Sequence, residues 1–237
     1  MDSPGPEFAL SQRSPEFLAV LESAARLQEL VPDAVVVGGT AAALYASHRL
    51  STDHDHVLAD LRDRFEVVLE ALEADPGWAT NRVVPARVIL GNLDGIEAGV
   101  RQMIRTVPLE VTEIGLLSGA RLRVPTLAES LRIKGFLVVQ RNQTRDYLDL
   151  AALADRMGPD PAASLLSDMD RFYSDQNSSV DGVASQLMRQ LGDPKPADPS
   201  VLDQLDSYKG LQDRWTEWSE VVAICRDLAV RMVEADL

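Results

Sequence analysis

Residues 35–57, VVVGGTAAALYASHRLSTDHDHV, constrain the fold more than any other stretch of this chain. Three valines form an apolar run that ends in a glycine turn, and small residues from about Ala41 to Ser47 predict a short helix. Backbone N–H groups in such a turn can approach a phosphate, and the dipole of the following helix favours the anion. We therefore predict that Gly38, Gly39 and Thr40 bind phosphate.

Two carboxylates follow this helix on a second extended run. Asp53 and Asp55 are one residue apart, so strand alternation points both to one face and turns His54 and His56 to the other. Mg²⁺ prefers one or two carboxylates together with phosphate oxygens of a substrate. The pair beside the glycine turn thus indicates a nucleoside triphosphate site with one or two Mg²⁺ ions, and the alternative is an exposed acidic turn.

The spacing of GGT, a short helix and HRLSTDHD resembles the nucleotidyltransferase superfamily of the polymerase-beta type, and within it the AbiEii/MenT group of toxins from toxin–antitoxin systems. Residues 124–150, VPTLAESLRIKGFLVVQRNQTRDYLDL, resemble the second half of that group, so the resemblance covers about residues 30–155. It implies an α+β fold with a core sheet, flanking helices and a helical C-terminal region. It also implies transfer of a nucleoside monophosphate from an NTP to an acceptor hydroxyl, at the 3′ end of tRNA, by a toxin with a cognate antitoxin.

A third metal-binding carboxylate is expected on a strand adjacent to the aspartates, and the resemblance suggests Glu110 in PLEVTEI. Strand alternation puts Glu110 and Glu113 on opposite faces, so only one of them can point at the metal. Asp94 in GNLDG is the competing candidate, although asparagine and glycine around it are typical of a turn.

Lys134 shares the apolar stripe of its expected helix with Leu127, Leu131 and Val138, which indicates that it faces inward. An inward lysine needs a counter-charge, and a triphosphate would provide one. A side chain that extends to solvent is the alternative. We predict that Lys134 is catalytic and binds the nucleotide.

The resemblance assigns the segment RDYLD a part in the transfer as well. Asp146 would deprotonate or position the attacking hydroxyl, although any acid in the first turn of a helix is favoured by the dipole. Arg145 would pair with phosphate or with Asp149.

The family usually has apolar residues where this chain has His54 and His56. With His48 they fall within nine residues, which would suit a transition metal. Because alternation turns two of them away from the aspartates, we interpret His54 and His56 as packing residues behind the site. Trp215 and Trp218 are expected on one face of a helix over 212–235, as a packed interface or a stacking platform for bases.

A net charge of −14 is unusual for a protein that binds the phosphate backbone of a nucleic acid. It suits an enzyme that modifies a small molecule such as an antibiotic, and a non-catalytic interaction protein on the same scaffold is a third possibility. A local basic patch near the two motifs would still permit RNA. Its candidates are Arg82, Arg87, Arg101, Arg105, Arg132, Arg141 and Arg145.

The 237 residues are expected to form two domains: residues 1–124 with the nucleotidyltransferase-type sheet, and residues 125–237 with helices that complete the active site. Helices are expected from Ser14 to Leu30, from Asp60 to Ala74, and from Thr126 onward. The single cysteine, Cys225, lies among apolar residues and indicates a buried thiol in a reducing cytoplasm. No apolar run is long enough for a membrane span, and no signal peptide is expected.

Overall fold

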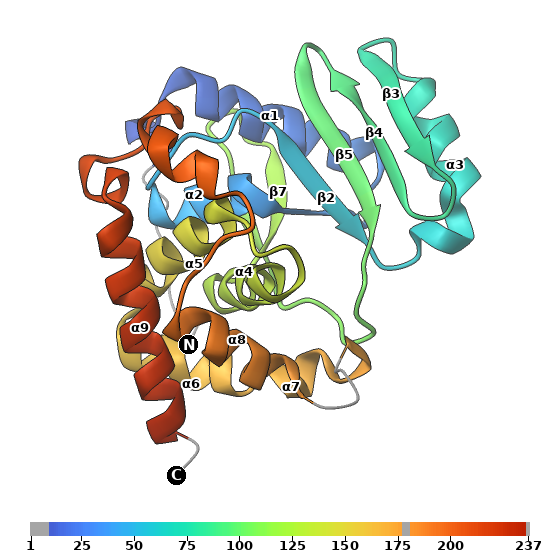
Figure 1. Ribbon diagram of the computed structural model, residues 1–237. Helices are drawn as coiled ribbons and strands as arrows, with labels where there is room; N and C mark the ends of the chain where they lie inside the picture. The colour runs from blue at the N-terminus through green and yellow to red at the C-terminus, as the bar shows by residue number, and fades with distance from the viewer. Residues whose placement is uncertain (1–9, 177–180, 236–237) are drawn as a thin grey trace, which may run out of the picture. The chain divides into compact units, whose positions relative to one another are not determined.

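A computed structural model describes residues 10–176 and 181–235. The chain forms two compact units. The sheet unit comprises the described residues up to Tyr45 together with Ser51–Gln102 and Thr112–Val124, and the helical unit comprises Ala46–Leu50, Met103–Val111 and the described residues from Pro125 onward. Figure 1 labels the elements of both units.

The sheet unit is built on five strands in the order β1-β2-β5-β4-β3 (Figure 1). Strand β2 runs parallel to β5 and antiparallel to β1, and the remaining neighbours are antiparallel. Two further strands, β6 and β7, form a separate ribbon. The strands are β1 (Val35–Val37), β2 (His54–Leu58), β3 (Trp78–Val84), β4 (Val88–Leu93), β5 (Ile96–Gln102), β6 (Val111–Gly115) and β7 (Arg121–Pro125).

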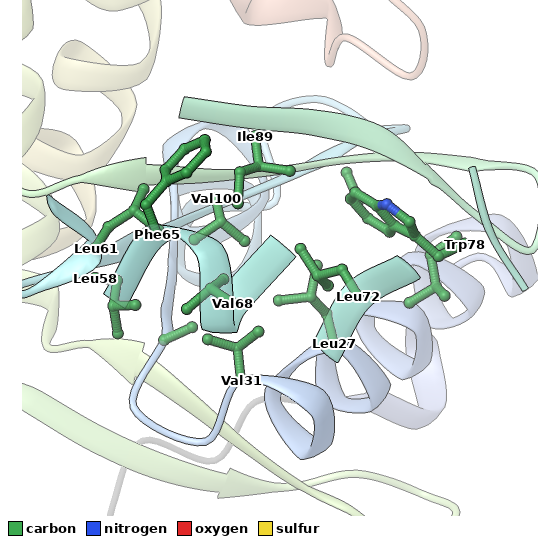
Figure 2. Close-up of a cluster of buried hydrophobic side chains, with 13 residues drawn as sticks. Leu27, Val31, Leu58, Leu61, Phe65, Val68, Leu72, Trp78, Ile89 and Val100 are labelled. Carbon is green, nitrogen blue, oxygen red and sulfur yellow. The ribbon is translucent and has the colours of Figure 1, made fainter. Parts of the chain in front are cut away.

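Helices α1 (Pro15–Leu30) and α3 (Leu61–Glu73) pack on one face of this sheet, while α2 (Gly38–Ala46) follows β1 directly. As predicted, Ser14 caps α1: its hydroxyl accepts a hydrogen bond from the Phe17 N–H, and proline occupies the first turn. Figure 2 shows the core between the helices and the strands, where Leu72 and Val68 of α3 meet Trp78 and Ile89. Removal of these apolar surfaces from water is the main stabilising contribution of the unit.

The helical unit contains α4 (Leu127–Arg141), α5 (Thr144–Met157), α6 (Pro159–Ser167), α7 (Met169–Phe172), α8 (Val183–Gly192) and α9 (Trp218–Ala235), with shorter 3₁₀ turns between them. Thr126 caps α4 through the Glu129 N–H, and Asn142 ends it in the left-handed conformation. Among the described residues, none of the helices combines the length and hydropathy of a membrane span.

The predicted α+β class, with a core sheet, flanking helices and a helical C-terminal region, is confirmed. The prediction of one helix over 212–235 is wrong, because Trp215 lies in a separate 3₁₀ turn, Asp213–Thr216, and Trp218 begins α9. Trp215 is buried, so its face cannot act as an open stacking platform. The thiol of Cys225 is buried as predicted, and burial raises its pKa to about 12.

Candidate functional site

The glycine turn of the sheet unit lies directly against Asp55. Val37, the last residue of β1, pairs with Asp55 on β2, and Gly38 follows with a positive φ of 73°. A Cβ atom added to Gly38 would lie 3.8 Å from the Asp55 carboxylate. Glycine is therefore favoured by the left-handed backbone conformation, while the added Cβ would make only an ordinary van der Waals contact with Asp55.

Asp53 and Asp55 differ in how firmly they are held. Asp53 is exposed and precedes β2; its Oδ1 accepts a hydrogen bond of 3.1 Å from the Ser51 hydroxyl, and its backbone carbonyl accepts one from the Thr40 hydroxyl. Asp55 lies on β2 with 34% of its side chain exposed. Both carboxylates are thus accessible, and the Thr40 hydroxyl is already engaged, which leaves the backbone N–H of Thr40 for a ligand.

Strand β5 supplies two neighbours of Asp55 that the sequence analysis did not identify. Gly99 pairs with Asp55 across the parallel ladder, and a Cβ atom there would lie only 2.7 Å from Asp55 Oδ1. Arg101 Nε donates a hydrogen bond of 3.1 Å to the same oxygen. Glu97, two residues before Gly99 and exposed, shares this face by alternation. No local sequence pattern reveals these neighbours, because α3, β3 and β4 separate β2 from β5 along the chain.

The opposite face of β2 carries the histidines, as alternation predicted. His54 and His56 are buried with their rings edge to face at 5.2 Å, and His54 Nε2 lies 3.0 Å from the Ser23 hydroxyl. Burial lowers the pKa of His54 to about 4 and that of His56 well below its usual value, so both are neutral at pH 7. Within the described residues no three histidine, cysteine, aspartate or glutamate side chains are grouped to hold a metal, and this applies to the histidines and equally to Asp53, Asp55 and Glu110 as a set.

Glu110 does not lie where the sequence analysis placed it. The strands beside β2 are β1 and β5, whereas Glu110 precedes β6 and belongs to the helical unit, where Arg132 Nη1 pairs with it at 2.9 Å. The prediction of an adjacent-strand position for Glu110 is therefore wrong. The competitor Asp94 is a turn residue with a φ of 50°, as its sequence context indicated, and it pairs with Arg26. Glu113 pairs with Arg121 at 2.8 Å.

Lys134 faces inward in the helical unit, as its periodicity predicted, and it finds a protein counter-charge there. Its Nζ lies 2.6 Å from Asp149 Oδ2 and 3.5 Å from Asp146 Oδ1, and the side chain is 4% exposed. The argument that an inward lysine needs a ligand's phosphate therefore does not hold for this structure, because two carboxylates already balance the ammonium.

Asp149 is the centre of this buried cluster. His48 Nε2 lies 2.7 Å from its Oδ1, and Arg49 donates to both carboxylate oxygens at 2.8 and 3.0 Å. Burial alone would raise the pKa of Asp149, but Arg49, Lys134 and His48 together hold it well below its usual value. Burial lowers the pKa of His48, and this effect outweighs the hydrogen bond with Asp149, which by itself would raise the pKa.

Asp146 and Arg145 differ sharply in exposure. Asp146 is fully buried, its Oδ1 accepts a hydrogen bond of 2.8 Å from Arg141, and its Oδ2 has no hydrogen-bond partner among the described residues. Arg145 is exposed and donates to Gln143 at 3.1 Å. The alternative that Arg145 pairs with Asp149 is wrong, because Asp149 is saturated by partners from elsewhere in the unit.

Comparison with known proteins adds sequence relatives and structural neighbours. No known family profile matches the chain. The heme uptake protein MmpL11 of Mycobacterium tuberculosis is 34% identical over 91% of this chain, and the mycolic acid-containing lipids exporter MmpL11 of Mycolicibacterium smegmatis is 31% identical over 95%. In both cases the match covers 22% of the relative, so the chain spans about a fifth of the length of these curated relatives.

Among solved structures, the MenT4 nucleotidyltransferase toxin of Mycobacterium tuberculosis is similar with a TM-score of 0.58 at 20% identity, over 96% of this chain and 87% of that one. A candidate nucleotidyltransferase from H. pylori is similar with a TM-score of 0.51 at 18% identity, over 94% of this chain and 98% of that one. These likenesses extend over nearly the whole chain. The chain therefore has the nucleotidyltransferase fold.

Proposed function

We propose that the protein transfers a nucleoside monophosphate from an NTP to an acceptor hydroxyl and releases pyrophosphate. The observation that carries this proposal is the glycine turn at Gly38 packed against Asp55 on the sheet of a nucleotidyltransferase fold. The turn offers backbone N–H groups at the start of α2, and the aspartates beside it offer accessible carboxylate oxygens. Groups suited to binding phosphate and groups suited to binding a metal ion thus lie next to each other.

The donor set fits Mg²⁺. Asp53 and Asp55 provide only hard oxygen ligands, and both are reachable from solvent. Two carboxylates leave most of an octahedral shell to phosphate oxygens and water, which is the usual arrangement for Mg²⁺ at nucleotide sites. We propose that these two residues hold one or two ions, which would neutralise charge on the triphosphate.

The protein's own residues orient the reaction. We propose that the N–H groups of Gly38, Gly39 and Thr40 fix the phosphates of the NTP. The acceptor oxygen then attacks the α-phosphorus, the bond from that phosphorus to the bridging oxygen of pyrophosphate breaks, and the hydroxyl proton passes to a carboxylate or to water. Arg101 donates a hydrogen bond to Asp55 Oδ1 and so occupies one of the two oxygens of this carboxylate.

Lys134 and Asp146 remain our predicted catalytic residues of the helical unit, and Arg145 a predicted phosphate contact. Asp146 carries a fully buried Oδ2 without a hydrogen-bond partner among the described residues, so packing alone does not account for this carboxylate. Lys134→Ala would remove one of the cations that balance Asp149 and could therefore destabilise the helical unit. Loss of transfer in this variant indicates a catalytic role only if its urea unfolding midpoint is close to that of the wild type.

For the acceptor, we propose the 3′ end of tRNA, with the protein acting in the cytoplasm as the toxin of a toxin–antitoxin pair. The likeness of the fold to the MenT4 toxin supports this role. A small-molecule acceptor is the alternative that the net charge of −14 favours.

A second candidate is a non-catalytic module of a transport system. It is favoured by one observation, the 34% identity to MmpL11 of Mycobacterium tuberculosis over 91% of this chain. In this case the fold would serve protein contacts, and the carboxylates would not bind Mg²⁺ with measurable affinity.

The test is incubation of the protein with each α-³²P-labelled NTP, Mg²⁺ and total tRNA. We expect label on tRNA that is lost by about 100-fold or more in Asp55→Asn, since one metal-binding carboxylate is removed. Asp63→Asn is the matched control, because Asp63 is an exposed acid on α3 and its loss changes the charge equally. Label in both variants would contradict the assigned site, and absence of label and of Mg²⁺–NTP binding in the folded protein would favour the transport module.

A further inference from the structure

Three arginines of the sheet unit stand apart in their surroundings. Most arginines of this unit pair with carboxylates: Arg26, Arg64, Arg101, Arg121 and Arg123. By contrast, Arg62, Arg82 and Arg87 are exposed, and none of them forms an ion pair with another described residue. The chain has 37 acidic and 23 basic residues, so a group of cations without acidic partners requires an explanation.

These arginines gather at one end of the sheet. Gln102, the last residue of β5, connects the segments that carry two of them. Its side-chain amide accepts from the Arg62 N–H at 2.7 Å and donates to the Ala59 carbonyl at 2.6 Å, while its N–H donates to the Arg87 carbonyl at 2.8 Å. The start of α3, the turn between β3 and β4, and the end of β5 therefore meet at Gln102, and Figure 1 shows these elements side by side.

Arg82 extends this basic group across the sheet. Strand pairing sets Asp55, Gly99, Leu90 and Arg82 in one row across β2, β5, β4 and β3, so all four share the face that carries the metal-binding carboxylate. Leu90 is half-buried in this row. Adjacent strands lie about 4.8 Å apart, so Arg82 is about 14 Å from Asp55.

Acidic residues of the same strands lie at the other end. No aspartate or glutamate occurs between Trp78 and Leu93, and the first acids after them are Asp94 and Glu97, around the turn between β4 and β5. Within the strands, the acids and the arginines Arg82 and Arg87 thus lie at opposite ends, whereas Arg62 at the start of α3 has the acidic sequence neighbours Asp60, Asp63 and Glu66. A ligand with negative charges spaced along its length would match this layout.

We propose that this basic end of the sheet, formed by Arg82, Arg87 and Arg101 with Arg62 at its margin, binds the phosphate backbone of a nucleic-acid acceptor. The inference rests on the proposed nucleotidyl transfer and decides between its RNA and small-molecule forms. A triphosphate held by the turn at Gly38 does not extend to Arg82, because three inter-strand spacings, about 14 Å, separate Arg82 from Asp55. Half-buried Leu90 offers an apolar surface for a base between the two charged regions.

The test measures binding of a short fluorescein-labelled single-stranded RNA to the full chain by anisotropy over a series of KCl concentrations. The double variant Arg82→Gln/Arg87→Gln is compared with Arg156→Gln/Arg226→Gln, whose two arginines are exposed, lack ion pairs among the described residues and lie in the helical unit. Both pairs change the net charge equally. We expect the first pair to weaken binding about tenfold or more and to reduce the salt slope by about 2, and the second pair to leave both nearly unchanged.

Equal weakening in both pairs would overturn the inference, because binding would then follow total charge and not this surface. The inference would also be overturned if the wild-type protein transferred nucleoside monophosphate to a small molecule and bound no RNA at low salt. In that case the proposed transfer reaction would stand, and only the proposal of a nucleic-acid acceptor would fail. Failure of the transfer reaction itself is seen separately, as absence of Mg²⁺–NTP binding in wild-type protein. Retention of Mg²⁺–NTP affinity in Arg82→Gln/Arg87→Gln shows that the RNA effect does not arise from a damaged nucleotide site.

Discussion

Asp55 in the sheet unit and Asp149 in the helical unit are both aspartates bonded to arginine, but their surroundings differ in every other respect. Asp55 is 34% exposed and has one partner, Arg101, which is itself half-exposed. Asp149 is fully buried, and its carboxylate pairs with His48, Arg49 and Lys134. The first carboxylate has free coordination capacity toward solvent, and the second has none.

This difference separates binding from positioning. A carboxylate with open lone pairs can accept a cation from solution at little cost, whereas a saturated, buried one cannot do so without losing protein partners. We therefore expect substitutions at Asp55 to act on ligand binding and activity, and substitutions at Asp149 to act on stability. Each prediction below tests one side of this comparison.

The largest effect is expected for Asp149→Asn, which leaves Arg49 and Lys134 buried with insufficient negative charge. Breaking a buried ion pair by removal of one partner costs about 3–5 kcal/mol, so the urea unfolding midpoint should fall markedly. Asp155→Asn on the same helix is the control, because Asp155 pairs with Arg214 at the surface and should hardly change the midpoint. Equal midpoints for the two variants would show that the buried cluster does not stabilise the helical unit.

Gly99→Ala should damage the exposed site without unfolding the protein. The new Cβ would lie 2.7 Å from Asp55 Oδ1 and 2.9 Å from a Leu90 methyl group, so the carboxylate must move away. We expect nucleotidyl transfer to fall by about tenfold or more, as for an ångström-scale misplacement at an active site, with a small loss of stability. Gly115→Ala is the control, since nothing lies within 4 Å of its added Cβ. Full activity in Gly99→Ala would argue against a catalytic role of Asp55.

A smaller effect is expected from pH, through the histidines behind Asp55. Burial holds the pKa of His54 at about 4, below the value near 6.5 of an unfolded histidine. Between these values the unfolded chain binds more protons than the folded one, so stability is complete above about pH 6.5 and declines as the pH falls toward 4. The urea midpoint between pH 7 and 5 should therefore fall less steeply in His54→Leu than in wild-type protein. Parallel curves would contradict the assignment of the decline to this histidine.

Local chemistry explains which features were predictable from the sequence. The turn at Gly38, the cap at Thr126 and the inward direction of Lys134 depend on residues within a few positions, and the structure has all three. The partners were not predictable, because His48 and Asp149 are 101 residues apart. In the same way, Gly99 reaches Asp55 only through the parallel pairing of β2 with β5.

Glu110 was misplaced for a related reason. Alternation predicts the face of a strand but not which strand lies next to it, and β6 pairs with β7 instead of joining the five-stranded sheet. The apolar residues keep a helical spacing from Asp213 into α9, which is why one continuous helix was predicted. The structure instead has a break between the 3₁₀ turn that contains Trp215 and the start of α9 at Trp218. Patterns of hydrophobicity thus fixed the type of most elements, while pairing and interruptions required the three-dimensional structure.

The smallest effect, and the one that sharpens the comparison most, is expected for Arg101→Gln. The pair of Arg101 with Asp55 is exposed, so its loss should leave the free energy of unfolding within about 0.5 kcal/mol of wild type. Because the guanidinium occupies an Asp55 oxygen that Mg²⁺ would use, its removal should tighten Mg²⁺ binding a few-fold in a calorimetric titration. Arg121→Gln, which releases Glu113 from a more exposed pair, controls for the change in net charge. Weaker Mg²⁺ binding in Arg101→Gln alone would mean that Arg101 holds Asp55 in its binding orientation and does not compete with the metal, so even the exposed carboxylate would depend on a protein partner for its position.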